Sequence, residues 1–202
     1  MPVEEAKETY HYVFVYGTLK SGESYNHFLA RPTDGRASLV GPARTVKKWP
    51  LVLASSYKIP CMLPYEGVGH EVYGEVYEVD DRMLELLDRL ESHPDFYVRS
   101  LQDVDVLSQP HSEGADIEAV TNSAKSSPKL PGNHSGFPSR RKVWVYFMRK
   151  NEEELLKLPH VSSYTLKPGI NLPELTADKE ESQRFLTSEF LNVPRNDSGI
   201  SD

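Results

Sequence analysis

The chain has 202 residues, which fits one domain with additional terminal segments. Its formal net charge of −7 repels phosphate backbones and anionic lipids, so nucleic acid and membrane surfaces are not expected as partners. Hydrophobic residues make up 38% of the chain, a low share, and we therefore expect part of it to lie outside the core.

The single cysteine, Cys61, argues against an internal disulfide framework and against a zinc site built on several thiolates. The acidic N-terminal residues lack the apolar segment of a secretion signal, and no run of about 18 apolar residues is long enough to span a bilayer. The seven histidines form no H-E-x-x-H motif, so we expect no metal site. These features predict a reduced, soluble protein of the cytoplasm.

The first part of the chain predicts mainly strands. Residues 11–16 are aromatic and β-branched, which is typical of a buried strand, and Gly17 ends it. A second strand is predicted at 46–54, where Pro50 indicates an edge position or a bulge. The other segments expected here are a polar arm at 1–10, a short helix at 26–30 and an irregular apolar stretch at 59–64.

Further along, residues 70–79 alternate polar and apolar side chains, which predicts a strand with one wet face and a close backbone approach at Gly74. Residues 108–140 are rich in Ser, Pro, Gly and Asn and predict a flexible insertion. The remaining predicted elements are a helix at 80–91, strands at 97–107 and 142–148, helical turns at 152–158 and a short helix at 180–191.

These elements are mostly strands, and they lack the regular strand–helix alternation of a doubly wound fold. The pattern favours an α+β domain built around one curved or closed sheet. We expect this domain to span residues 11–172, with the insertion at 108–140, between the polar arm at 1–10 and a polar tail at 173–202.

The helix at 80–91 places a carboxylate on its apolar side. Asp80 or Asp81 is a plausible N-cap, and five apolar residues form one arc of the helical wheel. Glu91 projects on that same arc. Burial and the helix C-terminus both raise the pKa expected for this carboxyl group, toward the range useful for a general base. Two alternatives stay open: the last turn frays into solvent, or Glu91 pairs with a cation such as Arg99.

The turn after the first strand is the second candidate feature. Gly17 permits a sharp turn, and successive backbone N–H groups in such a turn form a concavity that binds a carboxylate or an oxyanion. A plain turn is the alternative, and the spacing of a P-loop is absent.

Several short motifs together resemble the gamma-glutamylcyclotransferase family. They occur in the expected order at residues 13–20, 73–77, 87–92, 97–99 and 143–146. The resemblance covers residues 12–107 and 141–170, and it implies a small mixed β-barrel-like sheet with few flanking helices. The insertion and the tail have no counterpart in this resemblance.

The resemblance also implies an activity. Family members cyclise a γ-glutamyl group to 5-oxoproline and release the attached amine, without a metal or organic cofactor. The acid/base carboxylate of the family corresponds to Glu91. Its substrate-cradling loop corresponds to Tyr16, Gly17, Thr18 and Leu19.

Within the family, the sequence most resembles members that act on γ-glutamyl amines, which implies a small isopeptide such as γ-glutamyl-ε-lysine as the substrate. The alternatives are a cyclotransferase for γ-glutamyl amino acids and a non-catalytic adaptor on the same fold. Tyr97 and Tyr146 are expected to line the pocket or to orient Glu91, and simple core packing is the alternative for both tyrosines.

Overall fold

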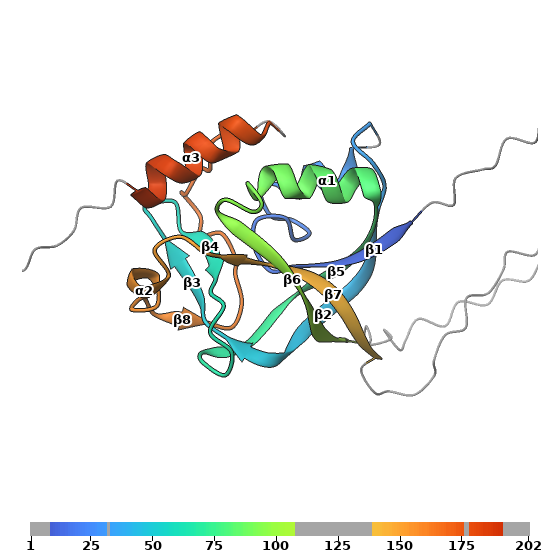
Figure 1. Ribbon diagram of the computed structural model, residues 1–202, viewed down its shortest axis with the longest axis horizontal. Coiled ribbons are helices and arrows are strands. Elements are labelled where there is room, and N and C mark those ends of the chain that lie inside the picture. The colour runs from blue at the N-terminus through green and yellow to red at the C-terminus, as the bar shows by residue number, and fades with distance from the viewer. Residues whose placement is uncertain (1–8, 32, 108–138, 176–177, 192–202) are drawn as a thin grey trace, which may run out of the picture.

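The computed structural model describes residues 9–31, 33–107, 139–175 and 178–191. Five strands close into a barrel in the order β1-β5-β2-β6-β7. Neighbouring strands are antiparallel except for β1 and β7, which meet in parallel and close the barrel (Figure 1). The barrel strands are β1 (Tyr10–Val15), β2 (Ala37–Trp49), β5 (His70–Asp80), β6 (Tyr97–Val106) and β7 (Ser139–Met148).

A smaller sheet of order β4-β3-β8 and a few helices complete the fold. Figure 1 shows α1 and α3 on the same side of the molecule, and the two helices are in contact. This arrangement confirms the predicted α+β class with a barrel-like sheet. The remaining elements are β3 (Leu51–Ala54), β4 (Ile59–Met62), β8 (His160–Val161), the 3-10 helix η1 (Asn26–Ala30), α1 (Asp81–Leu90), α2 (Glu152–Leu155) and α3 (Lys179–Leu191).

The strand predicted at 46–54 is wrong as a single element. It divides at Pro50, which has no N–H to donate to a ladder, so that Trp49 ends β2 in the barrel and Leu51 begins β3 in the small sheet. The first part of β2 escaped prediction because its side chains are mostly polar or exposed.

Two other segments also differ from the prediction. The stretch 59–64, expected to be irregular, contains strand β4, which tolerates Pro60 because it lies at the edge of its sheet. Ser139 and Arg140, assigned to the insertion, already belong to β7. The rest of that insertion, and residues 1–8 of the arm predicted at 1–10, lie outside the described residues, and Tyr10 of that arm already belongs to β1.

Alternating residues of β1 enter two hydrophobic clusters, as the two-residue period of a strand requires. Val13 and Val15 pack in the cluster that includes the buried face of α1. Phe14, together with Tyr16 directly after the strand, packs in a second cluster formed largely by the barrel strands. The close approach predicted at Gly74 is confirmed, since a Cβ there would overlap the Val15 carbonyl oxygen.

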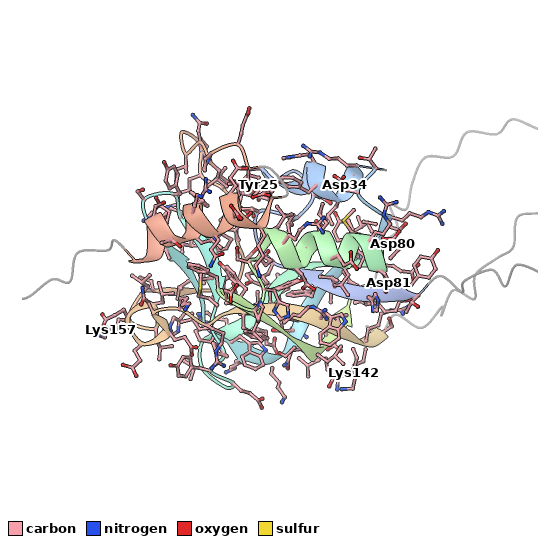
Figure 2. The ribbon with its side chains drawn as sticks, turned by 45° about the horizontal axis from the view of Figure 1, so that its top comes forward. Tyr25, Asp34, Asp80, Asp81, Lys142 and Lys157 are labelled. Atoms are coloured by element: carbon pink, nitrogen blue, oxygen red, sulfur yellow. The ribbon has the colours of Figure 1, made fainter. Side chains whose placement is uncertain are left out.

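Helix α1 begins at the predicted cap. Figure 2 labels Asp80 at the start of α1. Its carboxylate accepts a hydrogen bond from the Met83 N–H at 2.8 Å and another from the Arg36 N–H at 2.9 Å. The helix ends at Leu90, and Glu91 is its C-cap. The charged side chain is therefore held at a defined helix end.

The short helix predicted at 180–191 is confirmed as α3, and this helix packs on the domain although it lies within the segment predicted as a polar tail. Its Leu186 is buried in the same cluster as the α1 leucines. Among the described residues, none of the helices combines the length and apolarity that a membrane span needs.

Candidate functional site

A cavity of about 80 Å³ lies where the end of β1, the end of α1 and helix α3 meet. Its size suits part of a small molecule rather than a macromolecular segment. All the residues that the sequence nominated line this one cavity, although they come from four separate parts of the chain. They are Tyr16, Gly17, Thr18, Leu19, Glu91, Tyr97 and Tyr146.

Glu91 is set at this cavity by the end of α1, where its backbone N–H bonds the Leu87 carbonyl oxygen at 2.9 Å. Within the described part of the chain, its carboxylate has no hydrogen-bond or ion-pair partner. Burial raises the pKa of Glu91 from an ordinary 4.5 to about 7, and the negative charge of Asp88 acts in the same direction. The carboxylate thus neither frays into bulk solvent nor pairs with Arg99.

Arg99 binds Asp88 instead, one helical turn before Glu91. The guanidinium donates to both carboxylate oxygens, at 2.8 and 3.1 Å, and the Tyr146 hydroxyl donates to one of them at 2.7 Å. Asp88 was not among the residues that the sequence nominated for the site, so this cluster was not predicted. The available signal was the three-residue spacing from Glu91, which makes the two side chains neighbours on a helix.

The turn after β1 offers unused donors. Its carbonyl groups are occupied, because Gly17 O accepts from the Lys20 N–H at 3.1 Å and Thr18 O accepts from the Tyr25 N–H at 2.9 Å. In contrast, no hydrogen bond formed among the described residues uses the N–H groups of Gly17, Thr18 or Leu19. Three neighbouring donors beside a cavity can bind an anionic group.

The loop that carries this turn is anchored from β5. One oxygen of Glu75 accepts from the Ser21 N–H at 2.8 Å and from the Ser21 hydroxyl at 3.0 Å. Tyr77 adds a hydroxyl contact to Ser21 at 3.0 Å, and Asn26 bonds the Leu19 carbonyl oxygen at 2.9 Å. The turn is therefore rigid before any ligand arrives.

The tyrosines around Glu91 are buried and engaged. Tyr16 donates its hydroxyl to the Tyr146 carbonyl oxygen at 2.8 Å, so this hydroxyl holds β1 to β7. The Tyr97 hydroxyl oxygen lies 3.4 Å from the Cys61 sulfur. Burial raises the pKa of both tyrosines well above 10 and that of the Cys61 thiol to about 12. Among these groups, Glu91 is the one able to exchange a proton near neutral pH.

Comparison with known proteins identifies the family. The model of the family described as gamma-glutamyl cyclotransferase, AIG2-like, matches residues 13–166. The chain belongs to this family. It is therefore a cyclotransferase, and the predicted family and enzyme class are confirmed.

Relatives support this membership. The cyclotransferase is 38% identical over 183 residues to the Troponin C-akin-1 protein of Drosophila melanogaster, covering 89% of this chain and 92% of that one. It is 35% identical over 152 residues to the gamma-glutamylaminecyclotransferase of Homo sapiens, covering 75% and 88%. The bovine protein of the same name, from Bos taurus, is 51% identical over 88 residues, which cover 44% of this chain and 52% of the relative.

A solved structure agrees with the fold. The crystal structure of an AIG2-like protein from Mus musculus has a TM-score of 0.62 and 30% sequence identity, covering 81% of this cyclotransferase and 99% of the mouse chain. The matched range of the family model includes every nominated site residue but ends before α3. Helix α3 is thus a part of the cavity that the family model does not describe.

Proposed function

We propose that this cyclotransferase acts on γ-glutamyl amines, and that Glu91 is its general base and acid. The observation that carries this proposal is a partly buried carboxylate without a partner among the described residues, with a pKa raised to about 7, in a cavity that also adjoins three unused N–H donors. A base with this pKa is half ionised near neutral pH, where it can both accept and return a proton.

The reaction is an intramolecular aminolysis. The α-amine of the substrate attacks its own γ-carbonyl carbon, a new C–N bond closes the five-membered ring, and the bond to the leaving amine breaks. The α-ammonium loses two protons in becoming the lactam N–H, and the leaving nitrogen gains two. Glu91 carries these protons one at a time and ends in its starting state, so no metal or organic cofactor is needed.

The turn at Gly17–Leu19 would hold the folded substrate. Its N–H groups suit either the α-carboxylate or the γ-carbonyl oxygen, on which negative charge develops during attack. Keeping the γ-glutamyl chain folded places amine and carbonyl in contact, and this restriction supplies much of the rate. We propose that Tyr97 and Tyr146 line the space around Glu91 and keep water from it.

The cavity lining favours an amine over an amino acid as the leaving group. Among the described residues that line it, Glu91 is the only charged one, and no Lys, Arg or His is present. A γ-glutamyl amino acid would bring a second carboxylate, one carbon from the departing nitrogen, into this apolar space. The side-chain amine of lysine brings methylene groups instead. The substrate would then be a small isopeptide such as γ-glutamyl-ε-lysine, and the buried free thiol of Cys61 fits a reducing compartment such as the cytoplasm.

Release of 5-oxoproline tests this function. The purified protein should release it from γ-glutamyl-ε-lysine and much more slowly from γ-glutamyl-alanine. Glu91→Gln keeps the shape but removes the base, so turnover should fall by at least about 100-fold. Glu91→Asp should also fail, because it retracts the carboxylate by one methylene.

Glu85→Gln is the matched control, since Glu85 lies exposed on the same helix and should be dispensable. Full activity of Glu91→Gln would remove Glu91 from the mechanism. Faster release from γ-glutamyl-alanine would assign γ-glutamyl amino acids as the substrate class. Release from neither substrate would favour the hypothesis of a non-catalytic adaptor.

A further inference from the structure

Helix α3 contributes one face to the cavity. Ser182, Phe185 and Leu186 all line it, and their spacing of three and four residues places them on one side of the helix. Leu172 and Leu175, from the segment before α3, line the cavity next to them. All five residues lie beyond the range that the family model matches.

Ser182 has a buried hydroxyl without a hydrogen-bond partner among the described residues. The residue is 1% exposed. A serine inside a helix commonly bonds the carbonyl four residues earlier, but here the Asp178 carbonyl accepts, from the described residues, the Ser182 N–H at 3.1 Å and not the Ser182 hydroxyl. A buried hydroxyl left unpaired is unfavourable unless a ligand or an ordered water completes it.

The helix is held firmly at this position. Lys179, at the start of α3, donates to the His93 carbonyl oxygen at 3.2 Å and forms an ion pair with Asp95 at 3.1 Å. Both partners belong to the loop that directly follows Glu91. The Tyr25 hydroxyl also donates to the Pro173 carbonyl oxygen at 2.7 Å, and Figure 2 labels this tyrosine near α3. We call the cavity-lining residues Leu172, Leu175, Ser182, Phe185 and Leu186 the α3 wall. These contacts fix the α3 wall relative to the Glu91 carboxylate before a substrate binds.

Resting on the proposed function, we infer that the α3 wall is the binding site of the leaving amine, with Ser182 as a substrate-contact residue that hydrogen-bonds this part of the substrate. The charged ends of the γ-glutamyl group are served by Glu91 and by the turn at Gly17–Leu19. The α3 wall has no charged side chain facing the cavity. Its four apolar side chains suit the carbon chain of an alkyl amine, which packs on Phe185 and Leu186, and its one hydroxyl suits the nitrogen of that amine.

Steady-state kinetics of the full chain test this inference. The substrates are γ-glutamyl-methylamide, γ-glutamyl-butylamide and γ-glutamyl-ε-lysine, and 5-oxoproline serves as an inhibitor without an amine part. Ser182→Ala should lower kcat/KM for γ-glutamyl-ε-lysine by about 5- to 10-fold, as expected for one lost hydrogen bond. Inhibition by 5-oxoproline should stay unchanged. Ser188→Ala, an exposed serine of α3 that bonds the Phe185 carbonyl oxygen, should behave as wild type.

A second variant tests the apolar wall. Phe185→Ala should reduce the preference for the butylamide over the methylamide several-fold, because the longer chain loses its packing surface. Thermal unfolding of each variant shows whether α3 stays folded.

The inference is overturned if the wild type is active while Ser182→Ala and Phe185→Ala leave the whole substrate panel unchanged. It is also overturned if Ser182→Ala weakens 5-oxoproline inhibition as much as catalysis, since Ser182 would then contact the glutamyl part. A wild-type protein that releases no 5-oxoproline from any of the three substrates overturns the proposed function itself, and the inference with it.

Discussion

Glu85 and Glu91 are carried by the same helical segment, yet only Glu91 meets the cavity. The difference arises from the surroundings of each side chain. Burial removes the hydration that favours an ionised carboxylate, and the neighbouring charge of Asp88 disfavours it further, so the pKa of Glu91 rises to about 7. The surroundings of this one side chain thus decide at which pH the site can accept a proton.

The rate should depend on pH through this group. If Glu91 acts as the base, kcat/KM should rise with pH as the carboxyl loses its proton, with a midpoint at about 7. Below the midpoint the rate should fall by about tenfold per pH unit. Initial rates measured between about pH 5 and pH 9 check this. A flat profile across the range would contradict the assignment.

Asp88 should tune that midpoint. Asp88→Asn removes the second cause of the raised pKa and leaves Arg99 without its carboxylate partner, and both changes favour the ionised form of Glu91. The acidic limb of the kcat/KM profile should therefore move to lower pH. Glu85→Gln should leave the profile in place. A midpoint that stays fixed or moves upward in Asp88→Asn would rule out this coupling.

At the scale of elements, the site depends on contacts between strands that are distant in sequence. The turn after β1 presents its N–H groups because its loop is bonded to Glu75 on β5, and it lies against Pro60 of β4. Gly17 has no Cβ, which lets the turn approach that proline ring.

Gly17→Ala should displace the turn. The added Cβ would overlap the Pro60 side chain, and a proline ring offers little freedom to move away. We expect the free energy of unfolding to fall by about 1–3 kcal/mol, as for other overpacked sites. Turnover should fall by about tenfold or more, because the N–H donors shift. Urea unfolding and 5-oxoproline release measure the two effects.

Gly67→Ala provides the comparison for this experiment. Gly67 has a positive φ of 86° but open space around it, so alanine there adds only backbone strain. This variant should lose some stability and keep its turnover. Equal turnover in Gly17→Ala and Gly67→Ala would show that the position of the turn is unimportant.

On the scale of the whole molecule, the Glu91 carboxylate lowers the free energy of unfolding, because its raised pKa reflects an ionised form that the folded state disfavours. The folded state raises the pKa of Glu91 from 4.5 to about 7, so folding favours its protonated form. Below pH 4.5 the carboxyl is protonated in both states and costs nothing. Between pH 4.5 and about 7 the unfolded chain has lost this proton while the folded protein still holds it, so stability falls as pH rises across that window and levels off above about 7.

Glu91→Gln should therefore stabilise the protein above pH 7. The change in pKa from 4.5 to about 7 sets an upper bound of about 3 kcal/mol on the gain. The gain should shrink as pH falls toward 4.5, because the wild-type carboxyl then becomes neutral like the glutamine. Urea unfolding at about pH 5 and about pH 8.5 measures this difference. A variant no more stable than wild type at the higher pH would contradict the desolvation argument.

Features that depend on short stretches of chain were predictable. The apolar arc of α1 shows Glu91 on the wrong side of an amphipathic helix, and Asp80 is recognisable as a cap from its position before that helix. The turn after β1 is visible because a glycine follows a buried strand. Each of these signals is carried by residues within a few helical turns or one strand of each other.

Features that depend on closure of the barrel were not predictable. Asp88 finds Arg99 and Tyr146 only because β6 and β7 pair beside α1. The split of β2 from β3 depends on two sheets that the local pattern does not separate. Ser182 belongs to a weakly patterned segment that the sequence predicts as part of a polar tail.

The sequence by itself thus determined the family, the α+β class, the acidic residue and the turn, since all of these follow from local periodicity and short motifs. Tertiary structure alone decided that the turn, the carboxylate and α3 surround one cavity, and that Glu91 is left unpaired there while Asp88 takes the arginine. The physical reason is that burial and charge pairing are properties of neighbours in space. Those neighbours are brought together only when the barrel closes and the helices pack on it.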